Sequence, residues 1–82
     1  MALKILKTVE TKYWTEQHIE KMPLVDCLKS LDPKAHVQIY VWGEFFREGT
    51  AEKLALNDDV VNPPLVSDEV RIYKDGTIAV FA

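Results

Sequence analysis

The chain has 82 residues, of which 48% are hydrophobic and 28% are charged, and its formal net charge is −3. A chain of this length can enclose one small core, so we predict a single domain over residues 1–82. Its single cysteine excludes an internal disulfide framework, and the acidic balance argues against direct binding of nucleic acid, whose phosphates attract basic surfaces.

Targeting and membrane segments are not expected. The apolar start of the chain is interrupted by Lys4 and Lys7 and has no small-residue cleavage site, unlike a signal peptide. The longest uncharged run, residues 35–43, is about half as long as a membrane crossing requires. With one unpaired thiol, the protein is expected in a reducing cytoplasm.

The N-terminal residues predict a strand followed by a short helix. Residues 3–10 alternate apolar and polar side chains and predict a strand, with a frayed helix as the alternative. Thr15 is a good N-cap and Glu16 favours the positive end of a helix dipole, so a helix is predicted over residues 16–22. Pro23 should then begin or kink the next helix, because it lacks an amide proton.

A helix over residues 24–31 has the clearest apolar stripe. The positions that recur at helical spacing are Leu24, Cys27, Leu28 and Leu31. The stripe predicts one helix face packed against a sheet, and the helix should end before Pro33, because a residue preceding proline leaves the helical region.

The pattern then changes to a period of two. Residues 36–42 alternate β-branched and polar or aromatic side chains and predict a strand. Residues 43–44 are predicted to turn into a partner strand at 45–47, which ends at 48–49.

Residues 51–56 are predicted to form a short helix capped by Thr50. An extended surface loop is predicted over residues 57–66, because Pro63 and Pro64 follow a run of turn-forming residues.

The C-terminal residues 70–81 predict a hairpin that turns at Gly76. A two-residue loop would pair Ile72 with Ala79, whereas a three-residue loop would pair Ile72 with Ile78. The second register is preferred because it places the four β-branched residues on one face. The opposite face would then carry Arg71, Tyr73, Ala79 and Phe81.

Together these elements predict an α+β fold. We expect a small antiparallel sheet made of two hairpins, with the N-terminal strand as an optional addition. This sheet would pack against one main helix, residues 24–31, with a second short helix at 51–56.

No catalytic or metal site is expected. Cys27 could in principle act as a nucleophile with His18 or His36 as base, but its apolar stripe predicts a buried, inert thiol. The spacing of these three residues matches no compact set of metal ligands. The acidic residues of the second half lie in turns and loops, where solvation explains them. We therefore predict a protein that is not an enzyme, with no cofactor and no small-molecule substrate.

Charge is unevenly distributed along the chain. Residues 1–41 carry six Lys/Arg and five Asp/Glu, whereas residues 42–82 carry four and eight. The acidic half could form a surface that meets a basic partner, or it could simply keep the loops soluble.

The aromatic residues indicate a contact surface. Tyr40 and Trp42 lie on the strand parity opposite Val37, Ile39 and Val41, so they face away from the predicted core. With the far face of the C-terminal hairpin, they predict a protein interface made of Tyr40, Trp42, Tyr73 and Phe81.

Three short patterns carry a family resemblance. They are LDPKAHVxI at residues 31–39, GTAxxL at 49–54, and VxI with DGxIxV at 70–80. Over residues 23–82 the chain resembles small uncharacterised proteins encoded by bacteriophages and prophages of Gram-positive bacteria. The resemblance implies a cytoplasmic accessory protein of a mobile element that binds a host or phage protein, and it assigns no catalytic residue.

The leading expectation is therefore a non-enzymatic protein–protein interaction module that binds a protein partner or itself, most simply as a homodimer. One alternative is an acidic inhibitor or regulator of a basic nucleic-acid-binding protein, whose complex would weaken steeply with salt. A second alternative is a small enzyme or ligand-binding protein with its site between subunits, which would need convergent polar residues in an apolar cleft.

Overall fold

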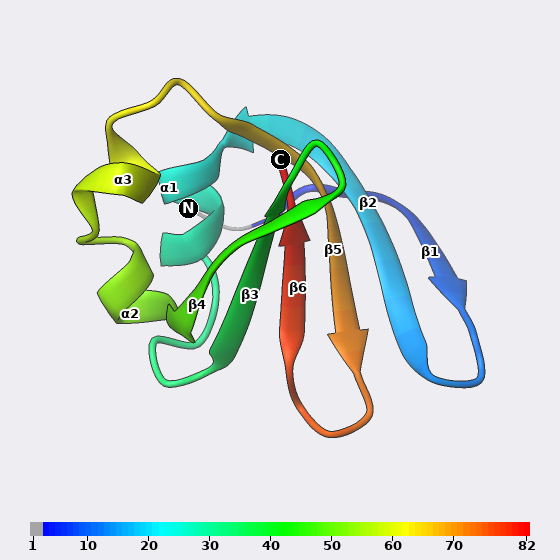
Figure 1. The fold of residues 1–82 in the computed structure, drawn as a ribbon. Helices are drawn as coiled ribbons and strands as arrows, with labels where there is room; N and C mark the ends of the chain where they lie inside the picture. The colour runs from blue at the N-terminus through cyan, green and yellow to red at the C-terminus, as the bar shows by residue number, and fades with distance from the viewer. Residues whose placement is uncertain (1–2) are drawn as a thin grey trace.

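The computed structural model describes residues 3–82 and shows one six-stranded sheet in the order β1-β2-β5-β6-β3-β4 (Figure 1). The elements are β1 (Ile5–Glu10), β2 (Trp14–Pro23), α1 (Leu24–Lys29), β3 (His36–Val41), β4 (Glu44–Thr50), α2 (Ala51–Leu54), α3 (Asp58–Val61), β5 (Val66–Tyr73) and β6 (Ile78–Phe81). The short helices gather beside β3 and β4, and β1 forms the opposite edge of the sheet.

The sheet is mixed, and it is larger than the sequence predicts. Neighbouring strands are antiparallel except β3 and β6, which are parallel. The expected fold, a small antiparallel sheet against one main helix, is therefore wrong. The missing information is non-local: β6, at the end of the chain, lies between β5 and β3, and local patterns do not report such pairings.

The predicted secondary structure differs most from the observed one at β2. Residues 16–22, predicted as a helix, lie within a ten-residue strand that pairs with β1 on one side and β5 on the other. Thr15 and Glu16 are good helix-start residues, but two flanking strands supply backbone partners along most of β2, and tertiary pairing overrides local propensity. The strand predicted over residues 3–10 is present as β1, which begins later, at Ile5.

The predicted helix at 24–31 is present as α1, which ends earlier, at Lys29. It begins directly after Pro23, and Leu24, Cys27 and Leu28 are buried as the stripe predicts. The predicted loop at 57–66 is wrong in part, because it contains α3. The Asn57 side chain caps α3 by accepting a hydrogen bond from the Asp59 N–H, and Val60 is buried.

The β3–β4 hairpin turns one residue earlier than predicted. Trp42 and Gly43 both have positive φ, 53° and 80°, which is the geometry of a two-residue type I′ turn between Val41 and Glu44. The partner strand also continues through Gly49 to Thr50. Thr50 then caps α2, as predicted, by accepting a hydrogen bond from the Lys53 N–H.

The C-terminal hairpin has the preferred register. Val70 pairs with Val80 and Ile72 pairs with Ile78, so the four β-branched residues share one face. Gly76 has a φ of 93° and lies in the turn, where only a residue that tolerates the left-handed region fits without strain.

The core lies on one face of the sheet, which we name the core face. Val37, Ile39, Val70 and Val80 are each 0% exposed there. They pack with the buried apolar residues of α1, α2 and α3 into one hydrophobic cluster. Burial raises the pKa of the Cys27 thiol in this cluster. Within residues 3–82, no helix is long and apolar enough to span a membrane.

Candidate functional site

The other face of the sheet carries no described helix, and we name it the open face. Because side chains alternate along a strand, the register that places Val70 and Val80 on the core face places their neighbours on this one. Its central side chains are Trp14, Glu16 and His18 of β2, Gln38 and Tyr40 of β3, Phe45 of β4, Glu69, Arg71 and Tyr73 of β5, and Ala79 and Phe81 of β6.

Aromatic side chains and one arginine form a continuous row across the open face. The row consists of Phe45, Tyr40, Phe81, Arg71, Trp14 and Tyr73. The Tyr40 and Phe81 rings stack with centroids 5.2 Å apart and planes 16° apart. The Arg71 guanidinium lies 4.6 Å from the Phe81 ring centroid and 5.2 Å from that of Trp14.

In this row, the ring faces of Phe81 are covered by neighbouring side chains. Phe81 lies in the sheet between Tyr40 and Arg71, and it contacts both, so its ring faces are occupied. A platform that stacks nucleic-acid bases needs aromatic faces open to solvent. Phe81 does not offer such a face, and Tyr, Trp and Arg, which make up much of the row, are the residue types enriched at protein interfaces.

Beneath the row, one residue of the open face is fully buried. Ala79 lies on this face opposite Arg71, yet it is 0% exposed. Its small side chain leaves room for the larger ones that cover it. The row is therefore ordered by packing, and Tyr40, Tyr73 and Phe81 are all half-buried.

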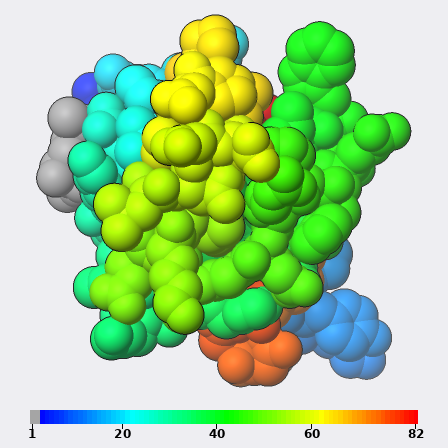
Figure 2. All heavy atoms as spheres, turned by 60° about the vertical axis from the view of Figure 1, so that its left-hand side comes forward, coloured from blue at the N-terminus to red at the C-terminus, as the bar shows by residue number. Residues whose placement is uncertain are grey.

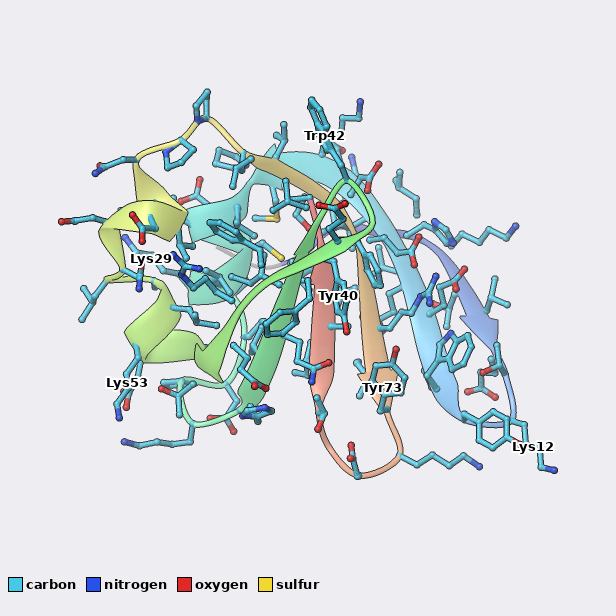
Figure 3. The ribbon with its side chains drawn as sticks, viewed as in Figure 1. Lys12, Lys29, Tyr40, Trp42, Lys53 and Tyr73 are labelled. Atoms are coloured by element: carbon cyan, nitrogen blue, oxygen red, sulfur yellow. The ribbon has the colours of Figure 1, made fainter. Side chains whose placement is uncertain are left out.

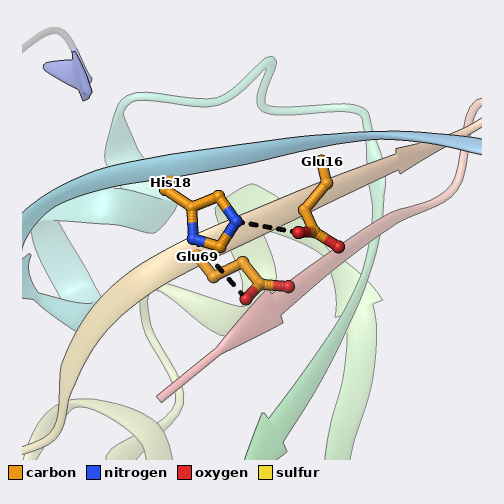
Figure 4. A group of neighbouring side chains, drawn as sticks. All are labelled: Glu16, His18 and Glu69. Carbon is orange, nitrogen blue, oxygen red and sulfur yellow. Dashed lines mark hydrogen bonds and ion pairs between the residues drawn. The ribbon is translucent and has the colours of Figure 1, made fainter. Parts of the chain in front are cut away.

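A charged cluster adjoins the row on β2 and β5 (Figure 4). His18 Nε2 lies 2.8 Å from Glu16 Oε2, and His18 Nδ1 lies 3.9 Å from Glu69 Oε1. The Arg71 Nε donates to Glu69 Oε2 at 2.8 Å and lies 3.4 Å from Glu16 Oε1. The hydrogen bond from His18 is the main reason that the pKa of Glu16 lies below its ordinary value.

Trp42 lies outside the row, at the end of the β3–β4 hairpin (Figure 3). Its side chain is 91% exposed. Its N–H donates to the Ala82 carbonyl at 3.1 Å, which ties the hairpin end to the chain that follows β6. In the space-filling view the green end of this hairpin stands out from the body of the molecule (Figure 2).

Of the four predicted interface residues, Tyr40, Tyr73 and Phe81 lie on the open face, whereas Trp42 lies in the turn. The sequence pattern assigned Trp42 to the strand because it continues the alternation of Tyr40. Its positive φ removes it from that alternation.

Sequence reasoning missed the contribution of β2. The helix predicted over residues 16–22 separates Glu16 and His18 onto different faces and leaves Trp14 before its cap. The signal that could have found them is their spacing of two, repeated by Glu69, Arg71 and Tyr73 in β5.

The three residues weighed as a nucleophile or metal set are not brought together. Cys27 is buried in the cluster on the core face, whereas His18 belongs to the open face. His36 Nε2 lies 3.0 Å from Glu48 Oε2, at the β3–β4 edge. The structure therefore offers Cys27 no histidine as a base.

An apolar hollow of about 340 Å³ lies between α1 and α2. Its lining residues are Leu28, Lys29, Leu31, Pro33, Ala51, Glu52, Ala55 and Leu56. The two charged residues do not converge on a common point with other polar groups, so the hollow lacks the polar set that orients a substrate.

Acidic residues of the second half are partly neutralised by the chain itself. Glu52 Oε1 lies 2.9 Å from Lys34 Nζ, and Asp59 Oδ2 lies 2.8 Å from Arg47 Nη2. Glu52 and Asp59 are therefore each paired with a basic side chain.

Comparison with protein-family models, with curated proteins and with solved structures found no match. The functional argument therefore rests on the geometry of the open face and the hairpin.

Proposed function

We propose that this protein is a non-enzymatic interaction module that self-associates through the open face and the β3–β4 hairpin. The observation that carries the proposal is Trp42, which is 91% exposed and held at a φ of 53°. Within residues 3–82 it is the one non-glycine residue with positive φ.

Trp42 is disfavoured in its place on two counts. The left-handed region costs an L-residue with a bulky side chain about 1–2 kcal/mol, and the type I′ turn is formed better by Asn or Asp before glycine. The exposed indole also leaves a large apolar surface in water. Such a residue is readily explained by a partner that buries it, since Trp is among the residues that contribute most to binding.

A second copy of this chain is the partner that the open face fits best. The face carries both signs of charge. Its basic residues are Arg71 and Lys7, and its acidic residues are Glu16, Glu69 and Glu48. A surface for a strongly basic or acidic partner would carry mainly one sign. Mixed charge is instead self-complementary about a two-fold axis, which is the usual symmetry of small homodimers.

The cellular setting is part of the same proposal. A buried, unpaired thiol at Cys27 is compatible with the reducing cytoplasm. A self-associating module without catalytic chemistry suits the accessory role in a mobile element that the sequence resemblance implies.

The oligomeric state tests the proposal directly. We expect sedimentation velocity of the full chain over a concentration series to show a monomer–dimer equilibrium. Trp42→Ser alone, and together with Tyr40→Ser, should shift that equilibrium towards monomer. Trp42 makes few intramolecular contacts, so the single variant should fold normally and show an unchanged circular dichroism spectrum.

The matched control is Leu56→Ser, which removes another exposed apolar side chain, 81% exposed, near α2 and away from the open face. The control should dimerise like the parent protein. A parent protein that stays monomeric at every concentration, or a Trp42→Ser variant with an unchanged equilibrium, would show that the partner is not a second copy bound in this way.

A further inference from the structure

We propose that Glu16, His18 and Glu69 form a divalent-cation site on the open face, of the class that Zn²⁺ occupies. One ligand atom from each residue lies within 4.8 Å of the other two, and all three residues are half-buried. The inference rests on the geometry of this cluster.

The strands hold the three donors in place. Glu16 and His18 are two residues apart on β2 and therefore share a face, and His18 pairs directly with Glu69 of β5. β2 is itself held between β1 and β5. Bringing the three ligand atoms to the spacing of bonds of about 2.0–2.2 Å to one ion thus needs side-chain rotation rather than backbone movement.

Outer donors orient both carboxylates. Trp14 Nε1 donates to Glu16 Oε1 at 3.4 Å, and Arg71 Nε donates to Glu69 Oε2 at 2.8 Å. The other oxygen of each carboxylate is the one nearest the His18 imidazole. An outer layer that fixes ligand orientation in this way is a regular feature of metal sites.

The donor set selects the class of cation. One imidazole nitrogen with two carboxylate oxygens suits Zn²⁺, and solvent can supply the fourth ligand of a tetrahedral site. Mg²⁺ prefers an octahedral shell made entirely of oxygen and suits this set poorly.

Two nearby basic side chains lower the affinity of this site for a metal ion. Arg71 contacts both carboxylates, and Lys7 of β1 lies opposite His18 of β2 in the strand register. Their positive charges offset the negative charges of Glu16 and Glu69, so we expect weaker binding of Zn²⁺ than in a structural zinc site.

The chain contains two histidines, so their imidazole signals in NMR spectra report the site directly. His36 with Glu48 is an internal control, a histidine beside one carboxylate on another part of the sheet. Titration with Zn²⁺ alone should shift the His18 signals in a saturable way and leave those of His36 nearly unchanged. Mg²⁺ at the same concentrations should move neither.

Variants complete the test, with affinity measured by calorimetry. His18→Asn and Glu69→Gln should each weaken Zn²⁺ binding at least about tenfold. His36→Asn should leave it unchanged. Equal responses of the two histidines, absence of saturation, an Mg²⁺ response equal to that of Zn²⁺, or unchanged affinity in Glu69→Gln would each overturn the proposal.

Discussion

The two faces of the sheet are built from different side chains. On the core face, Val37, Ile39, Val70 and Val80 are fully buried against the short helices. On the open face, aromatic and charged side chains stack on one another and stay half-buried. Burial of apolar area contributes about 25 cal/mol per Å², whereas exposed ion pairs and cation–π contacts each contribute about 1 kcal/mol or less. The core face therefore dominates stability, and the open face contributes less to it.

The strongest test of this difference is a truncation in the core. Leu28→Ala in α1 should lower the free energy of unfolding by about 2–5 kcal/mol, because it removes buried methyl groups and leaves a cavity. Urea denaturation followed by circular dichroism measures the change. Leu56→Ala, the same substitution at an exposed leucine, should change stability by less than about 0.5 kcal/mol. Similar losses in both variants would contradict the assignment of the core.

A smaller effect is expected at the centre of the open face. Arg71→Met keeps most of the side-chain stem but removes the charge that contacts two rings and two carboxylates. We expect a loss of about 1–2 kcal/mol in the same denaturation experiment. Lys74→Met, which removes an exposed cation at the end of the same hairpin, is the control and should be nearly neutral. A loss as large as that of Leu28→Ala would mean that the open face is a second core.

Trp42→Asn should raise the stability of the monomer by about 0.5–1 kcal/mol. Asn tolerates the positive φ that Trp42 adopts and is favoured in a type I′ turn before glycine. The same change should weaken self-association. The melting temperature at low protein concentration should therefore rise, while the fraction of dimer in sedimentation velocity should fall. If Trp42→Asn destabilises the monomer, the indole contributes to folding and is not explained by a partner.

The smallest effect concerns acid. The pKa of Glu16 is lowered in the folded state, so its ionised form stabilises the fold above the ordinary glutamate value of 4.5, and this stabilisation is lost as the pH falls through the folded value. Glu16→Gln should therefore reduce the difference between the free energy of unfolding at neutral pH and that at acidic pH. Denaturation curves at several pH values measure it, with Glu10→Gln on the edge strand as the control for loss of a negative charge. An unchanged pH profile would show that the contact with His18 contributes nothing measurable.

Local patterns predicted the elements whose partners are close in the chain. The register of Val70 with Val80 follows from one turn and from matching β-branched residues, and both are readable in the sequence. The stripe of α1 and the Thr50 cap of α2 are likewise local. The strand β2 was missed because its assignment depends on β1 and β5, and residues 16–22 alone resemble a helix start.

The same distinction applies to the candidate site. Tyr40, Tyr73 and Phe81 could be placed on the far face from alternation alone. The cluster of Glu16, His18 and Glu69 could not, because it exists only where β2 lies beside β5, which is more than forty residues later in the chain.

By itself, the sequence determined which side chains share a strand or helix face, because alternation and helical spacing are properties of a few consecutive residues. It also determined that Cys27 is buried, since the thiol belongs to an apolar stripe. Only the tertiary structure decided the order of the six strands and the parallel pairing of β3 with β6. These features depend on contacts between distant segments, and such contacts placed Arg71 between two aromatic rings and His18 between two carboxylates.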